Sequence, residues 1–328
     1  IIDRFGLKRL MIVGILFGAI SIIGLGQANT LPLFYACFIF NALGYVCAGP
    51  LPNQVLLSRW FKESRGKAMG FAYLGIGLGG AITVKMASWL TGRFGWQTSL
   101  ICLGVLMAVV ALPLTLMTDD KSKEFGQQSQ IPAAPLGEIL RSKSFYLLAI
   151  GSLCSIGAVG ATNQHLKLYL TRDNGFDQNT AANVIALVLF TSNVGRILMG
   201  WLADRYPKKY VMILIYLLVA AGIPLLFFIQ APGMIYLFAI VFGIGMGGDY
   251  MIIPLMAAEL FGVRVMGRVM GLIIVVDGLA EAWVPKLVGR LRDQNPNYTK
   301  GFALMIGLAL FGALAISLLP RKEKHADA

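Results

Sequence analysis

The chain has 328 residues, of which 57% are hydrophobic and 13% charged, and its formal net charge is +12. The hydrophobic residues fall in blocks close to the ~20 residues that an α-helix needs to cross a bilayer core. This arrangement excludes an ordinary soluble fold, in which apolar and polar residues alternate at helical or strand period. We therefore expect an all-α polytopic membrane protein that lies in the lipid bilayer.

Ten membrane-spanning helices are predicted from the apolar blocks and the residues that interrupt them. A polar interval over residues 118–143 is predicted to be a cytoplasmic central linker that ends in a short interfacial helix, and residues 320–328 a cytoplasmic tail. The ten spans, in chain order, are 9–27, 31–56, 66–90, 97–117, 144–169, 179–202, 209–230, 233–257, 268–289 and 300–319.

The loops on the side of the opening turn carry most of the Lys and Arg residues, whereas the opposite loops carry few, Arg172 and Arg292 among them. Because cytoplasmic loops are enriched in basic residues, this side is assigned to the cytoplasm. The positive charge then faces anionic lipid, and no nucleic-acid partner is expected. All four cysteines lie in apolar runs, so neither a disulfide framework nor a metal site is predicted.

Two charged turns, "IIDRFGLKRLMIVG" at the start and "LADRYPKKYVMI" from Leu202, resemble each other. The offset that separates Asp3 from Asp204 also carries Gly44 onto Gly245. A constant offset indicates a tandem duplication with both copies in the same orientation.

The duplication also predicts how the chain is divided. The second copy has two helices before its charged turn, so two further helices are expected before Ile1. This gives twelve helices as two six-helix bundles: an N-terminal bundle truncated to helices 3–6 (residues 1–117) and a C-terminal bundle of helices 7–12 (residues 144–319).

The charged turns are similar to the signature turn of the major facilitator superfamily, seen here as "DRFGLKR" from Asp3 and "GWLADRYPKK" from Gly200. Pro207 departs from that signature by replacing its second Gly. Longer stretches, "RWFKESRGKAMG", "NVGRILMGWLADR" and "GGDYMIIPLMAAELFG", resemble the monocarboxylate transporter and oxalate/formate antiporter branch. The resemblance implies the major facilitator fold and carriage of a small organic anion by alternating access of the two bundles.

In this superfamily the charged turns form a conformational latch. A carboxylate suits the positive N-terminal end of a neighbouring helix, and the following arginine can bind carbonyls or an acid of the other bundle. The resemblance implies that the helix beginning near Gly66 receives Asp204 and the one beginning near Gly267 receives Asp3. The alternative is that the turns only set topology. The latch candidates are Asp3, Arg4, Asp204 and Arg205.

Arg196 is the leading candidate for substrate binding, because a charge within a span is costly and its planar guanidinium matches a carboxylate. The resemblance assigns the matching arginine to this role, and a structural ion pair is the alternative. Asn193 lies one turn earlier on the same face. Further candidates are Asp249, Tyr250, Tyr45 and Tyr73, with core packing as the alternative for the tyrosines.

Two more acids, Asp277 and Glu281, share one helical face. The first copy has Ile76 and Gly80 at the equivalent positions, so these acids are not required by the helix architecture. Proton coupling is the role predicted for them, and the alternative is that Asp249 and Glu281 pair with neighbours and only hold helices together.

With Asp249 these two acids would leave the cavity negatively charged, which disfavours an anion. Either a bound proton would restore the balance, or Lys85 and Lys286 would reach into the cavity. The alternative for these lysines, which lie near the outer ends of their helices, is that they extend to the membrane interface. His165, near the outer end of its helix, is a candidate outer gate or an ordinary interfacial residue.

The sequence thus predicts a monomeric secondary active transporter of a small, monocarboxylate-like organic anion, proton-coupled as a symporter or anion-exchanging as an antiporter. It is expected in the cell (inner or plasma) membrane. A carrier of another solute class and a non-transporting membrane sensor are the alternatives. No enzyme is predicted, because no nucleophile with a base is evident, and no cofactor is expected.

Overall fold

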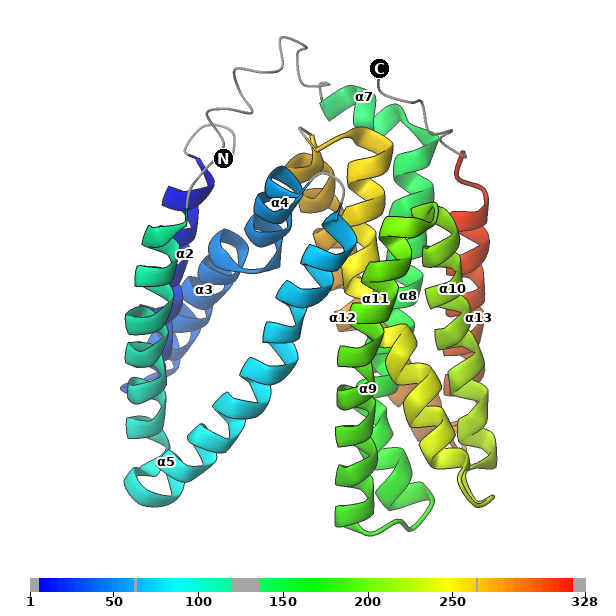
Figure 1. Ribbon diagram of the computed structural model, residues 1–328. Helices are drawn as coiled ribbons and strands as arrows, with labels where there is room; N and C mark the ends of the chain where they lie inside the picture. Colours follow the sequence, from blue (N-terminus) through cyan, green and yellow to red (C-terminus); the bar gives the residue numbers. More distant parts are fainter. Residues whose placement is uncertain (1–5, 62–63, 119–135, 264, 321–328) are drawn as a thin grey trace. The chain divides into compact units, whose positions relative to one another are not determined.

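The computed structural model describes residues 6–61, 64–118, 136–263 and 265–320, and every regular element within these ranges is a helix (Figure 1). The chain divides into two compact units, each considered by itself. The first comprises residues 1–62 and 75–133, and the second residues 63–74 and 134–328.

The first unit contains α2 (Leu7–Leu25), α3 (Leu31–Ala48), α4 (Pro50–Trp60) and most of α5 (Arg65–Met117). A proline at its first position starts α4 directly after α3. Gly95 interrupts α5, because its φ of +82° lies in the left-handed region that glycine adopts without strain. This break separates the two spans predicted over 66–90 and 97–117.

Glycines hold α2 and α3 close together. A Cβ atom at Gly44 would lie 2.7 Å from the backbone nitrogen of Gly18 and 2.9 Å from the carbonyl oxygen of Gly14. Small residues allow this approach of two helix backbones. Beside the crossing lies a cavity of about 460 Å³ lined by residues of α2 to α5.

The second unit contains the first turns of α5 and all helices that follow. A π-helical turn, η1, extends α8, and a 3₁₀ segment, η2, extends α10. The elements are α7 (Leu136–Arg141), α8 (Lys143–Leu168), η1 (Tyr169–Asp173), α9 (Gln178–Arg205), α10 (Lys208–Gly222), η2 (Ile223–Phe228), α11 (Met234–Phe261), α12 (Met266–Asp293) and α13 (Thr299–Ser317).

Helix α11 lies at the centre of this unit, packed against α9 and α10 along its length and also against α8 and α12. Its glycines permit the close packing. A Cβ at Gly247 would lie 2.0 Å from the Ser192 carbonyl oxygen on α9, and one at Gly248 would lie 2.6 Å from Ile215 on α10. The core around α11 therefore leaves little free space.

Each predicted span coincides within a few residues with a helix, with a pair of successive helices or, for 66–90 and 97–117, with the part of α5 on one side of Gly95. Within the described residues, eight continuous helical stretches are long and apolar enough to cross a membrane. Helix α12 is not among them, because it carries acidic and basic residues along its length. The short helix expected at the end of the linker is present as α7, whereas residues 119–135 of the linker and 321–328 of the tail lie outside the described residues.

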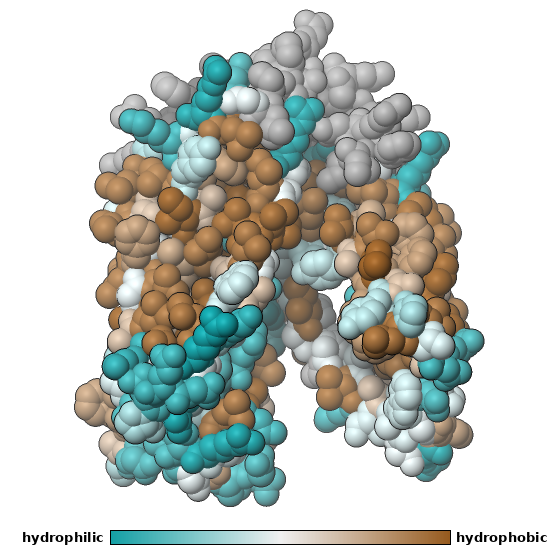
Figure 2. Space-filling model, turned by 180° about the vertical axis from the view of Figure 1, so that it is seen from behind, coloured by the Kyte–Doolittle hydropathy of each residue, from teal (hydrophilic) through white to brown (hydrophobic). Residues whose placement is uncertain are grey.

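The surface agrees with a membrane setting. Figure 2 shows hydrophobic side chains over the middle of the helices of the second unit and hydrophilic side chains gathered at one end. Exposed large hydrophobic residues are numerous on both units. In a soluble protein such a surface would promote aggregation, whereas in a bilayer it faces lipid tails.

Candidate functional site

Within the second unit, the N-terminus of α5 accommodates the carboxylate of Asp204 at the end of α9. The backbone N–H of Gly66 donates to Oδ1 at 2.7 Å, and that of Lys67 donates to Oδ2 at 2.9 Å. The contact expected between Asp204 and this helix is therefore present. It satisfies two N–H groups that have no partner within α5 and places a negative charge at the positive end of the helix dipole.

The other latch candidates are placed differently. The guanidinium of Arg205 lies over the ring of Trp201, 4.1 Å from its centroid, and the side chain is exposed. Asp3 and Arg4 lie outside the described residues. The latch role of all four therefore stays a prediction.

Arg196 projects from α9 one turn beyond Asn193 and is half-buried. Its Nη1 donates to Asn193 Oδ1 at 2.7 Å. The buried Tyr73, in the part of α5 that belongs to this unit, lies within electrostatic range of the guanidinium. Gly70 permits this proximity, since a Cβ there would lie 2.7 Å from the Arg196 carbonyl oxygen. Three predicted site residues are thus brought together.

Among the residues that the structure describes, no carboxylate forms an ion pair with Arg196. The alternative role, a structural ion pair, has no observed partner there. The N–H groups of Arg196 that do not bind Asn193 are therefore available to an anionic ligand, whose charge would compensate that of the guanidinium within the span.

Tyr45 belongs to the first unit, where it is exposed and lines the cavity beside α2 and α3. Tyr250 belongs to the second unit, and its hydroxyl is hydrogen-bonded to Glu281 Oε1 on α12. Both Tyr250 and Glu281 are exposed. A role in substrate binding stays a prediction for both tyrosines.

Asp277 lies one turn before Glu281 on α12 and is nearly buried. The hydroxyl of Ser152 on α8 donates to its Oδ1 at 2.6 Å. No ion pair of Asp277 or Glu281 with a basic residue is found in the described part of the chain. Lys286 does not balance these acids, because its ammonium group lies over the Trp283 ring, 5.0 Å from the centroid.

Asp249 lies in the interior of the second unit, with 0% of its surface exposed. Among the described residues, neither carboxyl oxygen has a partner in hydrogen-bond geometry, and the same is true of the buried Ser155 and Tyr216 hydroxyls. Asp249 has no exposed surface in this arrangement, and its substrate role stays a prediction. Neither Ser155 nor Tyr216 was predicted from the sequence. For Ser155 a signal exists in the sequence, because Ser152 and Ser155 lie one turn apart on α8.

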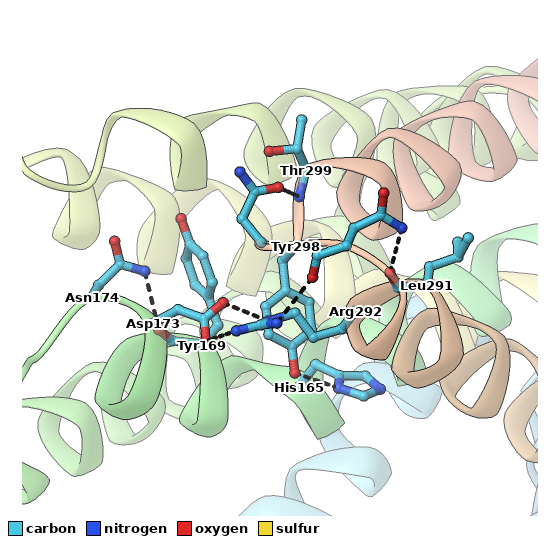
Figure 3. Close-up of polar contacts among 10 residues, drawn as sticks. His165, Tyr169, Asp173, Asn174, Leu291, Arg292, Tyr298 and Thr299 are labelled. Carbon is cyan, nitrogen blue, oxygen red and sulfur yellow. Dashed lines mark hydrogen bonds and ion pairs between the residues drawn. The ribbon is translucent and has the colours of Figure 1, made fainter.

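At the end of the unit that the sequence predicts to be the outer one, His165 on α8 contacts Pro285 of α12 and Tyr298 at the start of α13, and Figure 3 shows the contact with Tyr298. Its Nε2 lies 2.9 Å from the Pro285 carbonyl oxygen, which can only accept, so Nε2 carries the proton. Its Nδ1 lies 3.0 Å from the Tyr298 hydroxyl, and in the tautomer with its proton on Nε2 alone this hydroxyl donates to Nδ1. Burial raises the pKa of Tyr298, which keeps the phenol protonated as a donor.

A second contact fastens the same helix ends. Arg292 on α12 holds Asp173 at the end of η1 through two hydrogen bonds, Nε to Oδ2 and Nη2 to Oδ1, each 2.9 Å long (Figure 3). The outer ends of α8 and α12 are therefore clamped together beside His165. The sequence indicates Arg292 only as an outer-loop charge, because its partner is remote along the chain.

Among the described residues, no grouping of His, Cys, Asp and Glu side chains could hold a metal ion. Three sets of polar groups stand out in the second unit: Arg196 with Asn193 and Tyr73, the acids Asp249, Asp277 and Glu281, and the clamp formed by His165, Tyr298, Asp173 and Arg292.

Known proteins resemble the chain over nearly its whole length. It is 25% identical over 326 residues to monocarboxylate transporter 13 of Bos taurus, covering 97% of this chain and 74% of that protein. It is 24% identical over 348 residues to the cis,cis-muconate transport protein of Acinetobacter baylyi, covering 99% and 81%.

A solved structure shares the fold. The transporter FucP in its outward conformation superposes with a TM-score of 0.70 at 15% identity, covering 98% of this chain and 84% of that one. The family profile described as Major Facilitator Superfamily matches residues 1–285 and 149–327. Repeated charged turns, apolar helices and profile agree, and the chain belongs to the Major Facilitator Superfamily of membrane transporters.

Proposed function

We propose that this chain is a secondary active transporter of a small, monocarboxylate-like organic anion that works by alternating access. The observation that carries the proposal is Arg196, a half-buried guanidinium within a span that has no acidic partner among the described residues. A planar guanidinium donates two parallel hydrogen bonds to a carboxylate, and its charge compensates the charge of the solute.

The groups around Arg196 fit this role. Asn193 occupies one donor of the guanidinium and fixes its direction. Tyr73 brings a hydroxyl from a different helix, so solute binding would link α5 to α9. The names of two relatives, a monocarboxylate transporter and a cis,cis-muconate transport protein, both denote carboxylates and support the same solute class.

Coupling to protons belongs to the same proposal. Asp277 and Glu281 lie on one face of α12 without basic partners in the described chain, so a bound proton would remove their mutual repulsion. FucP, which shares the fold, is described as a fucose:proton symporter. We propose proton symport, with anion exchange as the remaining possibility, in a monomer of the cell (inner or plasma) membrane.

The test is uptake of labelled lactate, pyruvate, formate, oxalate, acetate and cis,cis-muconate into proteoliposomes, with and without a pH gradient. Arg196→Gln should raise the Km of the transported anion at least about tenfold, since a hydrogen bond to a charged group contributes roughly 1.5–3 kcal/mol. Arg196→Lys should recover part of the loss. Arg172→Gln, at an exposed outer position, is the matched control.

Normal uptake by Arg196→Gln would remove this residue from the site. If no anion moves and none stabilises the protein, a carrier of another solute class becomes the better interpretation. Asp277→Asn should abolish accumulation driven by a pH gradient while sparing exchange, and unchanged accumulation would exclude it from coupling.

A further inference from the structure

Three carboxyl groups of the second unit form a series in which burial increases step by step. Glu281 on α12 is exposed, Asp277 one turn earlier is 7% exposed, and Asp249 on α11 is fully buried. Both other acids lie within electrostatic range of Asp249, and Glu281 lies within range of Asp277. The series leads from the surface of the unit to its interior.

Two serines of α8 lie beside the inner part of this series. Ser152 and Ser155 are one turn apart and share a face of the helix. Ser152 donates to Asp277, and Ser155 lies beside Asp249. Ser155 is fully buried and its hydroxyl has no partner in hydrogen-bond geometry, so it is free to bond with the Asp249 carboxyl after a small shift.

The surroundings of Asp249 contain no positive charge among the described groups that face it. Tyr216 faces it from α10, and Cys154 on α8 lies within range of that phenol. From α12 come the two acids already named. From α9 come backbone atoms of Ser192 and Arg196 beside Gly247 and the uncharged side chain of Met199 beside Gly248.

An ionised carboxyl group in this position would be very costly. Burial of an unpaired charge costs several kcal/mol even after relaxation, and two neighbouring acids would add repulsion. A bound cation removes the cost. The tight contacts of Gly245 and Gly248 with α10 leave little space for a metal ion with several oxygen ligands, whereas a proton requires no additional volume.

We propose that Asp249 is an internal proton-binding site, reached from Glu281 through Asp277 and the two serines of α8. One proton passes inward. At each step an O–H bond breaks on the donor and one forms on the acceptor, and a serine gives up its proton as it receives another. The site deepens the proton coupling in the proposed function and is separate from the anion site at Arg196.

The experiment is infrared spectroscopy of the reconstituted full chain at neutral pH, in H₂O and after transfer to D₂O. A neutral carboxylic acid has a C=O stretch that shifts when its proton is exchanged for deuterium. Asp249→Asn should remove one such band. Glu259→Gln, whose acid pairs with Lys208 outside the series, should keep it.

The path is tested by the rate of deuterium uptake at that band. Ser155→Ala and Ser152→Ala should each slow the uptake roughly tenfold while keeping the band. If Asp249→Asn does not fold, the two serine variants still test the proposal, because an unchanged rate of deuterium uptake in both would contradict the proposed proton path.

A band that persists in Asp249→Asn would overturn the site. A second result would also overturn it: replacing sodium chloride by choline chloride lowers the melting temperature of the parent protein but not of Asp249→Asn. This result would mean that a sodium ion occupies the Asp249 site. Failure of anion uptake would leave the band unchanged, and absence of the band would leave anion binding at Arg196 unaffected. The two proposals can therefore fail separately.

Discussion

Helices α3 and α11 occupy equivalent places in the two copies of the repeat but differ sharply in their surroundings. The most apolar stretch of α11 is 67% buried, whereas that of α3 together with α4 is 11% buried. In its unit α11 is enclosed by α8, α9, α10 and α12, whereas α3 packs mainly on α2 and α4. Within this chain, α3 and α11 therefore differ in how much of their surface neighbouring helices cover.

The two copies share their helix crossings but not their charges. Gly44 on α3 and Gly245 on α11 both permit a close approach to the preceding helix of their copy. In contrast, Ala48 stands where the second copy has Asp249. The crossings belong to the repeated architecture, whereas the buried acids are additions of the second copy, as expected if they serve transport.

The largest effect is expected when the residue of one copy is placed in the other. Gly247 corresponds to Val46, whose side chain is 58% exposed on α3. Gly247→Val would drive a side chain into the Ser192 carbonyl of α9, where a Cβ alone would lie at 2.0 Å. Overpacking against a backbone should destabilise the protein by about 3 kcal/mol or more and reduce the yield of folded protein.

Val46→Gly is the matched control and should change stability by about 1 kcal/mol at most, through helix propensity alone. Thermal unfolding in detergent, followed by tryptophan fluorescence, measures both. Equal effects of the two variants would show that α3 and α11 are packed alike in the membrane, and the contrast between the copies would not hold.

An intermediate effect is expected at the charged turns. Asp204→Asn removes the negative charge at the N-terminus of α5 but keeps one acceptor for the N–H groups of Gly66 and Lys67. It should cost about 1 kcal/mol of stability and lower the uptake rate several-fold, because the contact between α5 and α9 is weakened. Uptake and unfolding are measured on the same preparation.

Asp3→Asn tests whether the first copy uses its turn in the same way. Similar losses in both variants would indicate two equivalent latches. Normal uptake in Asp204→Asn would mean that the observed contact is not used in transport, and loss of uptake in Asp3→Asn alone would place the latch in the first copy.

Much of this fold was predictable, because its determinants are local. Blocks of apolar residues define the spans, and Gly95 together with the Gly49–Pro50 step marks interruptions that a sequence shows directly. The constant offset of the repeat then orders the helices. A membrane strengthens this inference, since every backbone group in a span must be satisfied within its own helix.

The site was only partly predictable, because its members come from different helices. Charged residues are rare within membrane spans, so Arg196 and the acids can each be picked out of the sequence. No sequence pattern shows that Ser152 contacts Asp277 or that Asp173 contacts Arg292. Asp249 illustrates the limit most clearly. Its charge suggested a place in a solute cavity, whereas the rotation of α11 directs it into the helix core.

The smallest effect concerns an ion pair that only the second copy possesses. Lys208 Nζ and Glu259 Oε2 lie 2.8 Å apart, with side chains 22% and 23% exposed, where the first copy has the buried Leu7 and Ser58. A double-mutant cycle of Lys208→Ala and Glu259→Ala should give a coupling of about 0.2–1 kcal/mol that decreases with added salt, since partly exposed charges are screened. A salt-independent coupling above that range would mean that this end of the second copy depends on its charges for stability. The fold of the second copy would then rely on this ion pair. The buried acids of α11 and α12 would remain charges that the second copy has added without a role in holding its helices together.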